Sequence, residues 1–303
     1  MIKVFFENDA DLVKLYWDPI FKAVFTKSTP ESRIALGDLL SSILDREVEV
    51  LAVVANEPPI ENTRDKQIRY DVNCRFSTGE YANVEITVYP DNHEPKRLEY
   101  YGARLHASQP LKGKDISYRD IKETFQISII VNNVLYPDNV MIHHFEYYDK
   151  VNGISLGGCS NIIVIELSKL GNVVSKSLDE TTPIEDWAYF VLYCADKERR
   201  TRINQILERR EGIAMAAQTL LTISQDEEER ARLISEYKFI MDLQSKMVDA
   251  RREGHAEGHT EGCDERNSYI VSKMLRDGVN IEIISKYTGL TLDEIVQIGI
   301  FQN

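Results

Sequence analysis

Residues 67 to 89 place two runs of alternating polar and apolar side chains on either side of a Ser-Thr-Gly turn, and this pattern limits the fold more than any other feature. Successive side chains of a strand point to opposite faces, and a three-residue loop with glycine in the left-handed position is a common hairpin connection. A loop at Ser77–Gly79 pairs Phe76 with Glu80. The stretch therefore predicts a β-hairpin with one apolar face and one polar face.

The polar face of this predicted hairpin brings two acids together. In the register set by the turn, Asp71 lies opposite Glu85. The other pairs on this face are Arg69 with Thr87, Asn73 with Asn83 and Arg75 with Tyr81. Carboxylates directly opposite each other in an antiparallel pair have Cβ atoms roughly 5 Å apart and repel each other. Either a divalent cation such as Mg²⁺ lies between the two acids, or the neighbouring arginines neutralise them on an exposed face.

A mixed series of helices and strands surrounds the hairpin. Apolar residues at helical spacing predict helices over residues 18–27, from Pro30 to about 43 with Thr29 as the cap, and over 95–108. Strands are expected at 48–55, 67–76, 81–89, 126–131, 141–148 and 161–167. Helices that alternate with strands in this way are typical of an α/β or α+β domain.

The rest of the chain is predicted to be helical. Helices are expected at 183–195, 199–211, 213–223 and from 226 to about 261, and a compact three-helix module follows from residue 267 with turns at Gly278 and Gly289. The longest helix carries Gly254, Gly258 and Gly262 four residues apart. Each glycine costs about 1 kcal/mol relative to alanine in a helix interior. The spacing indicates either a close contact between helices or a weakly ordered linker.

Charge and cysteine content restrict the classes of function. The formal net charge of −13 argues against nucleic-acid binding by overall charge, because phosphate neutralisation needs clustered Lys and Arg. The four cysteines are far apart and form no C-x-x-C pair, which favours a reducing cytoplasm. No stretch approaches the roughly 20 apolar residues of a membrane span. We therefore expect a soluble, cytoplasmic protein with no membrane partner.

Several motifs, in order, resemble one family of nucleases. They are Asp18-Pro-x-Phe-Lys22-x-x-Phe, Asp65-Lys66 ahead of Tyr70-Asp71-Val72, Asn83-Val84-Glu85-Ile86-Thr87, Lys96-Arg97-Leu98-x-Tyr100-Tyr101-x-Ala-Arg104, and Ile165-Glu166-Leu167-Ser168-Lys169. Their order and spacing are similar to those of the Rpn family of recombination-promoting nucleases and transposases, a branch of the PD-(D/E)XK phosphodiesterases. The resemblance covers nearly the whole chain.

The resemblance implies a fold and an activity. The fold would be α/β, a PD-(D/E)XK nuclease-like mixed sheet flanked by helices at residues 1–170. An all-helical C-terminal region would follow, comprising a helical region with the long glycine-tetrad helix at 171–262 and a small module at 263–303. The activity would be that of a DNA endonuclease that depends on a divalent metal, Mg²⁺ or else Mn²⁺ or Ca²⁺, in DNA recombination or mobile-element biology. Asp71 and Glu85 would be its metal-binding acids, and the backbone carbonyl of Ile86 a further ligand.

Position 87 departs from the pattern of that family. The superfamily places lysine there and this family usually glutamine, whereas this chain has Thr87. Threonine carries no charge and is too short to replace either side chain in stabilising a charged phosphate. Arg69, Lys66 and Lys22 are the candidates to supply the missing charge. The site is therefore either competent through another cation or weakened.

Further residues have both a functional and a structural interpretation. Lys22, Arg69, Arg97 and Arg104 are the expected DNA-binding residues, with surface ion pairing as the alternative. Asp18 is either an extra acidic ligand or the cap of the first helix. The His255 and His259 pair has the spacing of two metal ligands on one helix face, but the tetrad repeat alone explains that spacing.

Two classes of function follow from the sequence. The first is a metal-dependent DNA endonuclease with Asp71, Glu85 and Thr87 at its catalytic centre. The second is a nuclease fold without activity that binds DNA or a protein partner, as Thr87 and the acidic net charge suggest. The last predicted helix carries Asp293 and Glu294 and no Lys or Arg, which argues against direct DNA contact. The C-terminal helical region is instead expected to mediate formation of a homo-oligomer or to have a regulatory role.

Overall fold

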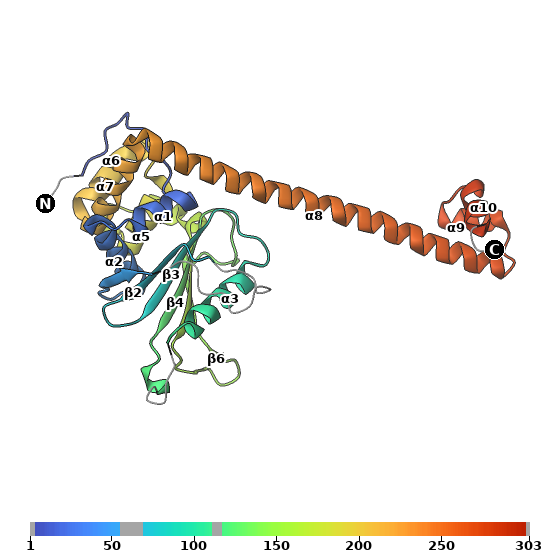
Figure 1. Cartoon of the computed structure of the whole chain (residues 1–303), viewed down its shortest axis with the longest axis horizontal. Helices are drawn as coiled ribbons and strands as arrows, with labels where there is room; N and C mark the ends of the chain where they lie inside the picture. The colour runs from blue at the N-terminus through green and yellow to red at the C-terminus, as the bar shows by residue number, and fades with distance from the viewer. Residues whose placement is uncertain (1–3, 55–68, 111–116, 301–303) are drawn as a thin grey trace. The chain divides into compact units, whose positions relative to one another are not determined.

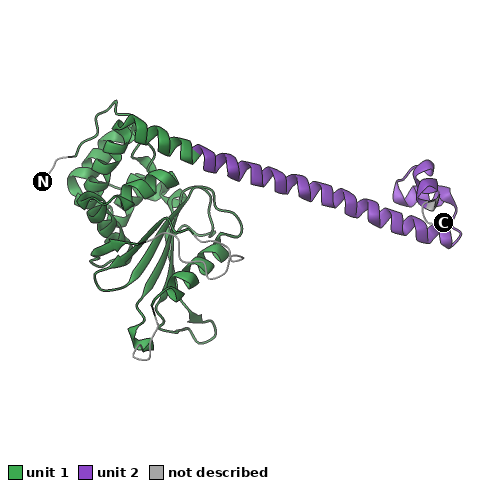
Figure 2. Ribbon diagram, viewed as in Figure 1, with its two compact units in different colours: residues 1–237 green, residues 238–303 purple. Residues whose placement is uncertain are grey.

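The structure is a computed structural model that describes residues 4–54, 69–110 and 117–300. Its internal contacts divide the chain into two compact units, with the division after Tyr237 (Figure 2). Each unit has its own hydrophobic core. The predicted hairpin and its two acids belong to the first unit, and the glycine tetrads and the C-terminal helices belong to the second.

A six-stranded mixed sheet forms the centre of the first unit (Figure 1). Its strands, in spatial order, are β1 (Val50–Val53), β2 (Val72–Phe76), β3 (Tyr81–Thr87), β4 (Thr124–Ile130), β8 (Ser160–Glu166) and β5 (Ile142–Phe145). The strands β3, β4 and β8 are parallel, and all other neighbours are antiparallel. A separate two-stranded ribbon, which the sequence did not predict, consists of β6 (Tyr148–Asp149) and β7 (Ile154–Ser155).

The hairpin of β2 and β3 has the predicted register. Gly79 adopts a left-handed conformation with φ of 98°, and the Phe76 N–H donates to the Glu80 carbonyl at 2.9 Å. The pairs that follow are Arg75 with Tyr81, Cys74 with Ala82, Asn73 with Asn83 and Val72 with Val84. The strand β2 begins at Val72, so Asp71 lies directly before it.

Helices cover both faces of the sheet (Figure 1). One face packs against α3 (Glu94–Ala107), where a Cβ added to Gly102 would lie 3.5 Å from side-chain atoms of Gln126 and Ile162. The other face shares a core with α1 (Asp18–Thr26), α2 (Pro30–Leu44), α5 (Pro183–Tyr193), α6 (Arg200–Arg209) and α7 (Glu211–Gln225). A short α4 (Gly171–Val174) precedes α5. The mixed sheet flanked by helices confirms the predicted fold class.

The two N-terminal helices start in different ways. Thr29 caps α2 as predicted, since its hydroxyl accepts from the Ser32 N–H at 3.2 Å. The prediction that Asp18 caps α1 is wrong. The cap position is Trp17, whose side chain makes no capping bond, and Asp18 is the first residue of the helix. Its carboxylate instead contacts Lys22, one turn further along α1.

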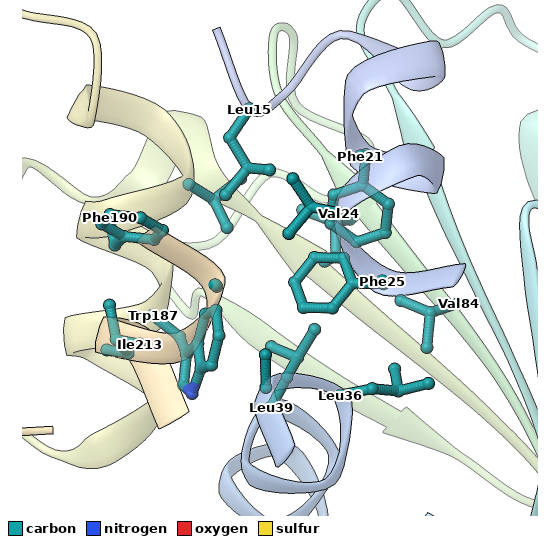
Figure 3. Packing of buried hydrophobic residues seen from close by; sticks show 14 of the residues in the cluster. Leu15, Phe21, Val24, Phe25, Leu36, Leu39, Val84, Trp187, Phe190 and Ile213 are labelled. Atoms are coloured by element: carbon teal, nitrogen blue, oxygen red, sulfur yellow. The ribbon is translucent and has the colours of Figure 1, made fainter. Parts of the chain in front are cut away.

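The large core lies between the sheet and its N-terminal and α5–α7 helices (Figure 3). Its labelled side chains are Leu15, Phe21, Val24, Phe25, Leu36, Leu39, Val84, Trp187, Phe190 and Ile213. Trp187 donates from Nε1 to Asp38 Oδ1 at 2.6 Å, which fixes α5 to α2. The helix α7 comes so close to α2 that a Cβ on Gly212 would lie 2.1 Å from the Cβ of Asp38.

The start of the long helix α8 (Glu227–Arg276) is joined to α1 by an aromatic contact. Trp17 stacks on Tyr237 with ring centroids 4.6 Å apart and an interplanar angle of 13°. Lys27 and Glu229 form an ion pair at 2.8 Å in the same region. The residues just before Asp18 are therefore held in place from α8.

The second unit ends in the three-helix module that the sequence predicts. The end of α8 packs with α9 (Ile281–Thr288) and α10 (Leu292–Ile300) around Val271, Ile284 and Ile295. Gly278 and Gly289 form the turns, with φ of 75° and 74°. The preceding helix does not end near 261 but continues to Arg276, because three glycines at about 1 kcal/mol each do not outweigh the good helix formers around them.

The four cysteines are free thiols, with Cys74 and Cys194 buried, Cys159 partly buried and Cys263 exposed. Burial raises the pKa of Cys74 to about 12 and that of Cys194 to about 11, which keeps both protonated at neutral pH. Within the part of the chain that the structure describes, no helix is both long and apolar enough to cross a membrane.

Candidate functional site

A buried polar layer lies between α3 and the sheet, on the face that the sequence predicted to be polar. Glu85 is at its centre and is 1% exposed. Asn83 donates from Nδ2 to Glu85 Oε1 and to Gln126 Oε1, both at 3.0 Å. Ser128, which pairs with Glu85 across β3 and β4, is also buried. The alternative of an exposed face with neutralising arginines is therefore wrong for Glu85.

Burial makes the charged form of Glu85 unfavourable. Burial together with the nearby negative charge of Asp71 raises the pKa of Glu85 to about 8, although Arg97 and the bond from Asn83 act in the opposite direction. Its Oε2 atom is buried and accepts no hydrogen bond from the described residues. A carboxylate in such a place is one that a bound cation would stabilise.

Asp71 lies at the open end of the hairpin. Its Oδ2 accepts from the Ile86 N–H at 3.2 Å, so the acid reaches across to the residue that follows Glu85. The N–H and the carbonyl of one strand residue point to the same side. The Ile86 carbonyl therefore points to the same side as Asp71. A metal ligand next to Asp71 would need this direction.

Helix α1 adds a third acid and a lysine to this end of the hairpin. Lys22 Nζ lies 3.0 Å from Asp71 Oδ1 and 3.2 Å from Asp18 Oδ1, so one cation bridges both acids. Burial and the charge of Asp71 raise the pKa of Asp18 to about 7, against the effect of Lys22. Asp18 thus lies near Asp71, and its role as an extra ligand stays a prediction. We call Asp18, Asp71 and Glu85 the acidic site.

Thr87, at the end of β3, is joined to α3 by polar contacts. Arg97 donates from Nη2 to Thr87 Oγ1 at 2.9 Å, and the same nitrogen lies 2.8 Å from Glu94 Oε1 and 3.3 Å from Glu85 Oε2. The Thr87 hydroxyl itself donates to Glu94 at 3.4 Å. Sequence reasoning missed Glu94, for which the only signal was its position three residues before Arg97 on one helix face.

The other predicted DNA-binding residues lie outside this cluster. Arg69 precedes β2 and is exposed, and its backbone is hydrogen-bonded to Tyr101 of α3. Arg104 lies two turns after Arg97 on α3, half-buried, where its charge affects Tyr70. Lys66, a candidate for the missing charge, lies outside the described residues.

A second charged cluster lies at the end of β8, in the Glu166-Leu-Ser-Lys169 motif. Glu166 is fully buried, and its Oε1 accepts from the Leu135 N–H at 2.5 Å. Its Oε2 lies 2.5 Å from Lys169 Nζ, and Lys169 also binds Asp138 at 2.9 Å. Because every charge here has a partner, this cluster fixes the loop before β5 to β8.

The acidic site fits a divalent cation in its donor chemistry. Asp18, Asp71, Glu85 and the Ile86 carbonyl offer oxygen ligands, which Mg²⁺, Mn²⁺ and Ca²⁺ prefer, and Glu85 has a buried oxygen without a hydrogen bond. Mg²⁺ is usually held by one or two carboxylates together with water and substrate phosphate. Across residues 4–54, 69–110 and 117–300, no group of three His, Cys, Asp or Glu side chains could hold a metal by itself.

Comparison with protein families identifies the family of this chain. The family model of the PD-(D/E)XK nuclease family transposases matches residues 15–250, which include α1, the whole sheet and α3. Searches of curated proteins and of solved structures gave no significant match. Since the model covers most of the chain and every residue of the acidic site, the chain belongs to the PD-(D/E)XK nuclease family transposases.

Proposed function

We propose that this chain is a DNA endonuclease that hydrolyses phosphodiester bonds with the help of a divalent metal ion. The observation that carries the proposal is that Lys22 joins Asp18 to Asp71, while Asp71 accepts from the N–H of Ile86, the residue directly after the buried Glu85. Burial, with a smaller effect of the charge of Asp71, raises the pKa values of Asp18 and Glu85, and buried acids with raised pKa values are typical of functional sites.

In this proposal the metal ligands are Asp71, Glu85 and the Ile86 carbonyl, with Asp18 as an additional acid. The ion is Mg²⁺, with Mn²⁺ or Ca²⁺ as substitutes. When bound, it lowers the pKa of a coordinated water and neutralises charge on the phosphate. Asp71 remains oriented by the Ile86 N–H, and Asn83 holds one oxygen of Glu85, so that the other oxygen stays available.

Lys22 has a double role in this proposal. Its ammonium group bridges Asp18 and Asp71, and therefore balances their charge before a metal binds. The side chain is flexible and 31% exposed, so it can turn from the acids to a DNA phosphate once a metal replaces it. Arg69 and Arg104 are the proposed backbone contacts further along the DNA strand.

Plasmid nicking tests the proposal. We expect the purified chain to nick supercoiled DNA with Mg²⁺ or Mn²⁺ and to be inactive in EDTA. Asp71→Ala and Glu85→Ala should each lower the cleavage rate by at least about 100-fold, because each removes one of the proposed metal ligands. Cleavage that persists in both variants would show that the site is assigned wrongly.

A second candidate function is a nuclease fold without activity that binds DNA or a protein partner. The observation in its favour is that Lys22 pairs with Asp18 and Asp71, and Arg97 with Glu85, so that cations of the chain itself neutralise the acids. Thr87, in place of lysine or glutamine, favours it too. A wild-type chain that folds, binds Mn²⁺ weakly or not at all, and nicks no DNA in any metal would establish this alternative.

The biological setting that we propose is DNA recombination or the movement of mobile elements, in line with the family. The proposed assembly is a homo-oligomer that forms through the C-terminal helical region. Its supporting feature is the row of Gly254, Gly258 and Gly262 on α8, where an added Cβ would meet no described atom within 4 Å. Small residues in such a row allow two helices to approach closely.

A further inference from the structure

The guanidinium of Arg97 lies in the space that a longer side chain at position 87, such as lysine, would reach. Its Nη2 lies one hydrogen-bond length, 2.9 Å, beyond the Thr87 hydroxyl and 3.3 Å from Glu85 Oε2. A lysine at position 87 would extend into this same space beside Glu85. The Arg97 guanidinium therefore fills the space that the short Thr87 side chain leaves beside Glu85.

The guanidinium of Arg97 is held in a fixed position. Glu94, which is 5% exposed, binds it at 2.8 Å from one turn earlier on α3. The centroid of the Tyr101 ring lies 5.5 Å from Arg97 Cζ. A cation that is oriented before the substrate arrives loses little entropy on binding it, and this is what electrostatic stabilisation of a reacting phosphate requires.

Arg97 also has hydrogen-bonding capacity left over. In the described part of the chain its hydrogen bonds and ion pairs all use Nη2, and its Nε–H is buried without a partner. The Arg97 side chain is 39% exposed. Its planar fork of N–H groups matches two oxygens of one phosphate.

We propose that Arg97 supplies the catalytic positive charge that is missing at Thr87, and that it binds the scissile phosphate beside Glu85. The inference rests on the proposed nuclease function. In the hydrolysis a water oxygen bonds to phosphorus, the bridging P–O bond breaks, and the leaving oxygen takes up a proton that the water gives up. Arg97 exchanges no proton in this step and neutralises the charge that develops on the phosphate.

A charge-relocation experiment tests the proposal. Cleavage is measured at saturating DNA with Mn²⁺ for wild type, Arg97→Met, Thr87→Lys and the double variant. Arg97→Met should lower the rate by about 100- to 1,000-fold, the usual effect of losing one stabilising donor. In the Arg97→Met background, Thr87→Lys should raise the cleavage rate at least tenfold. In the presence of Arg97, Thr87→Lys should lower activity, because two cations then compete for one place.

The matched control is Lys96→Met, which removes an exposed positive charge from the same turn of α3. It should change the rate at saturating DNA by less than about threefold. Arg97→Lys keeps the charge on a shorter stem and should retain more activity than Arg97→Met. If Arg97→Met does not fold, the double variant decides alone: cleavage within about tenfold of wild type supports the proposal, and a folded double variant that cleaves more slowly overturns it.

The outcomes separate this inference from the proposed function. If wild type cleaves and Asp71→Ala does not, but Arg97→Met cleaves as well as wild type, the nuclease function stands and the role of Arg97 is wrong. If the double variant folds and shows no recovery, the charge is not interchangeable between the two positions, and the inference is again wrong. A folded wild type without cleavage in any metal overturns the nuclease function and this inference with it.

Discussion

Glu85 is a residue whose charge the fold disfavours, and this gives stability a definite pH dependence. Its pKa is about 8 in the folded chain and about 4.5 in the unfolded chain, so the folded state holds the proton more tightly. The contribution of Glu85 is therefore most favourable below about pH 4.5, and it is lost as the pH rises to about 8. A bound metal reverses the trend, because it favours the charged carboxylate.

Comparison with Glu85→Gln isolates this effect. In EDTA we expect wild type and Glu85→Gln to have similar stability at pH 5, where the acid is protonated in the folded chain. By pH 8.5 wild type should be the less stable by at least about 1 kcal/mol, which is roughly 2–4 °C in melting temperature for a domain of this size. The measurement is thermal unfolding followed by circular dichroism. If the melting temperatures of wild type and Glu85→Gln depend on pH in the same way, the pKa of Glu85 is not raised in the folded chain.

The sequence predicted part of the site and missed part of it, for physical reasons. Asp71 and Glu85 follow from local rules, since the alternation and the turn at Gly79 fix the register of one hairpin. The link between Thr87 and Arg97 depends on where α3 lies over the sheet, which is a long-range contact. The sequence suggested Arg69, Lys66 or Lys22 for the missing charge, whereas the structure places the Arg97 guanidinium beside Thr87 and Glu85.

At the scale of the elements, glycines in two helices have opposite consequences. Gly212 at the start of α7 lies against Asp38 of α2, and Asp38 is held by Trp187 and cannot move aside freely. Gly258 in α8 has no described atom within 4 Å of an added Cβ. The first glycine is therefore needed for packing between helices, and the second is not needed within its own chain.

Alanine at each of these positions tests this distinction. Gly212→Ala should destabilise the first unit by about 1–3 kcal/mol, because the new methyl group overlaps the Asp38 side chain. Gly258→Ala should leave that unit unchanged and raise helix content, since alanine is favoured by about 1 kcal/mol in a helix interior. Urea unfolding followed by tryptophan fluorescence reports the first unit, and circular dichroism reports the helix. An unchanged urea midpoint in Gly212→Ala would contradict the close contact.

At the scale of the molecule, the helices that follow the sheet are part of its core. Trp187, Phe190 and Ile213 pack with Phe25 and Val84 in one cluster (Figure 3). Hydrophobic periodicity predicted these helices correctly, but it gives no information on which core a helix joins. The order of the parallel strands β3, β4 and β8 could likewise not be predicted from the sequence, because it depends on pairing between distant segments of the chain.

Assembly is tested on the whole chain. We expect the intact protein to have the mass of an oligomer in light scattering, and a chain truncated after Ala250 to have a lower mass at the same concentration. The glycine row allows close approach of a second α8, and alanine at Gly254, Gly258 and Gly262 together should weaken that contact without unfolding the helix. An unchanged mass after truncation would show that the C-terminal region does not mediate association.

Trp17, which stacks on Tyr237, provides an intrinsic fluorescence signal next to the candidate acidic site. Trp17 directly precedes Asp18, and the only other tryptophan of the chain, Trp187, is buried in the core. In a Trp187→Phe background, the remaining emission comes from an indole ring adjacent to the acids. Titration with a metal ion or with DNA can then be followed at the site itself, by intrinsic fluorescence and without a label.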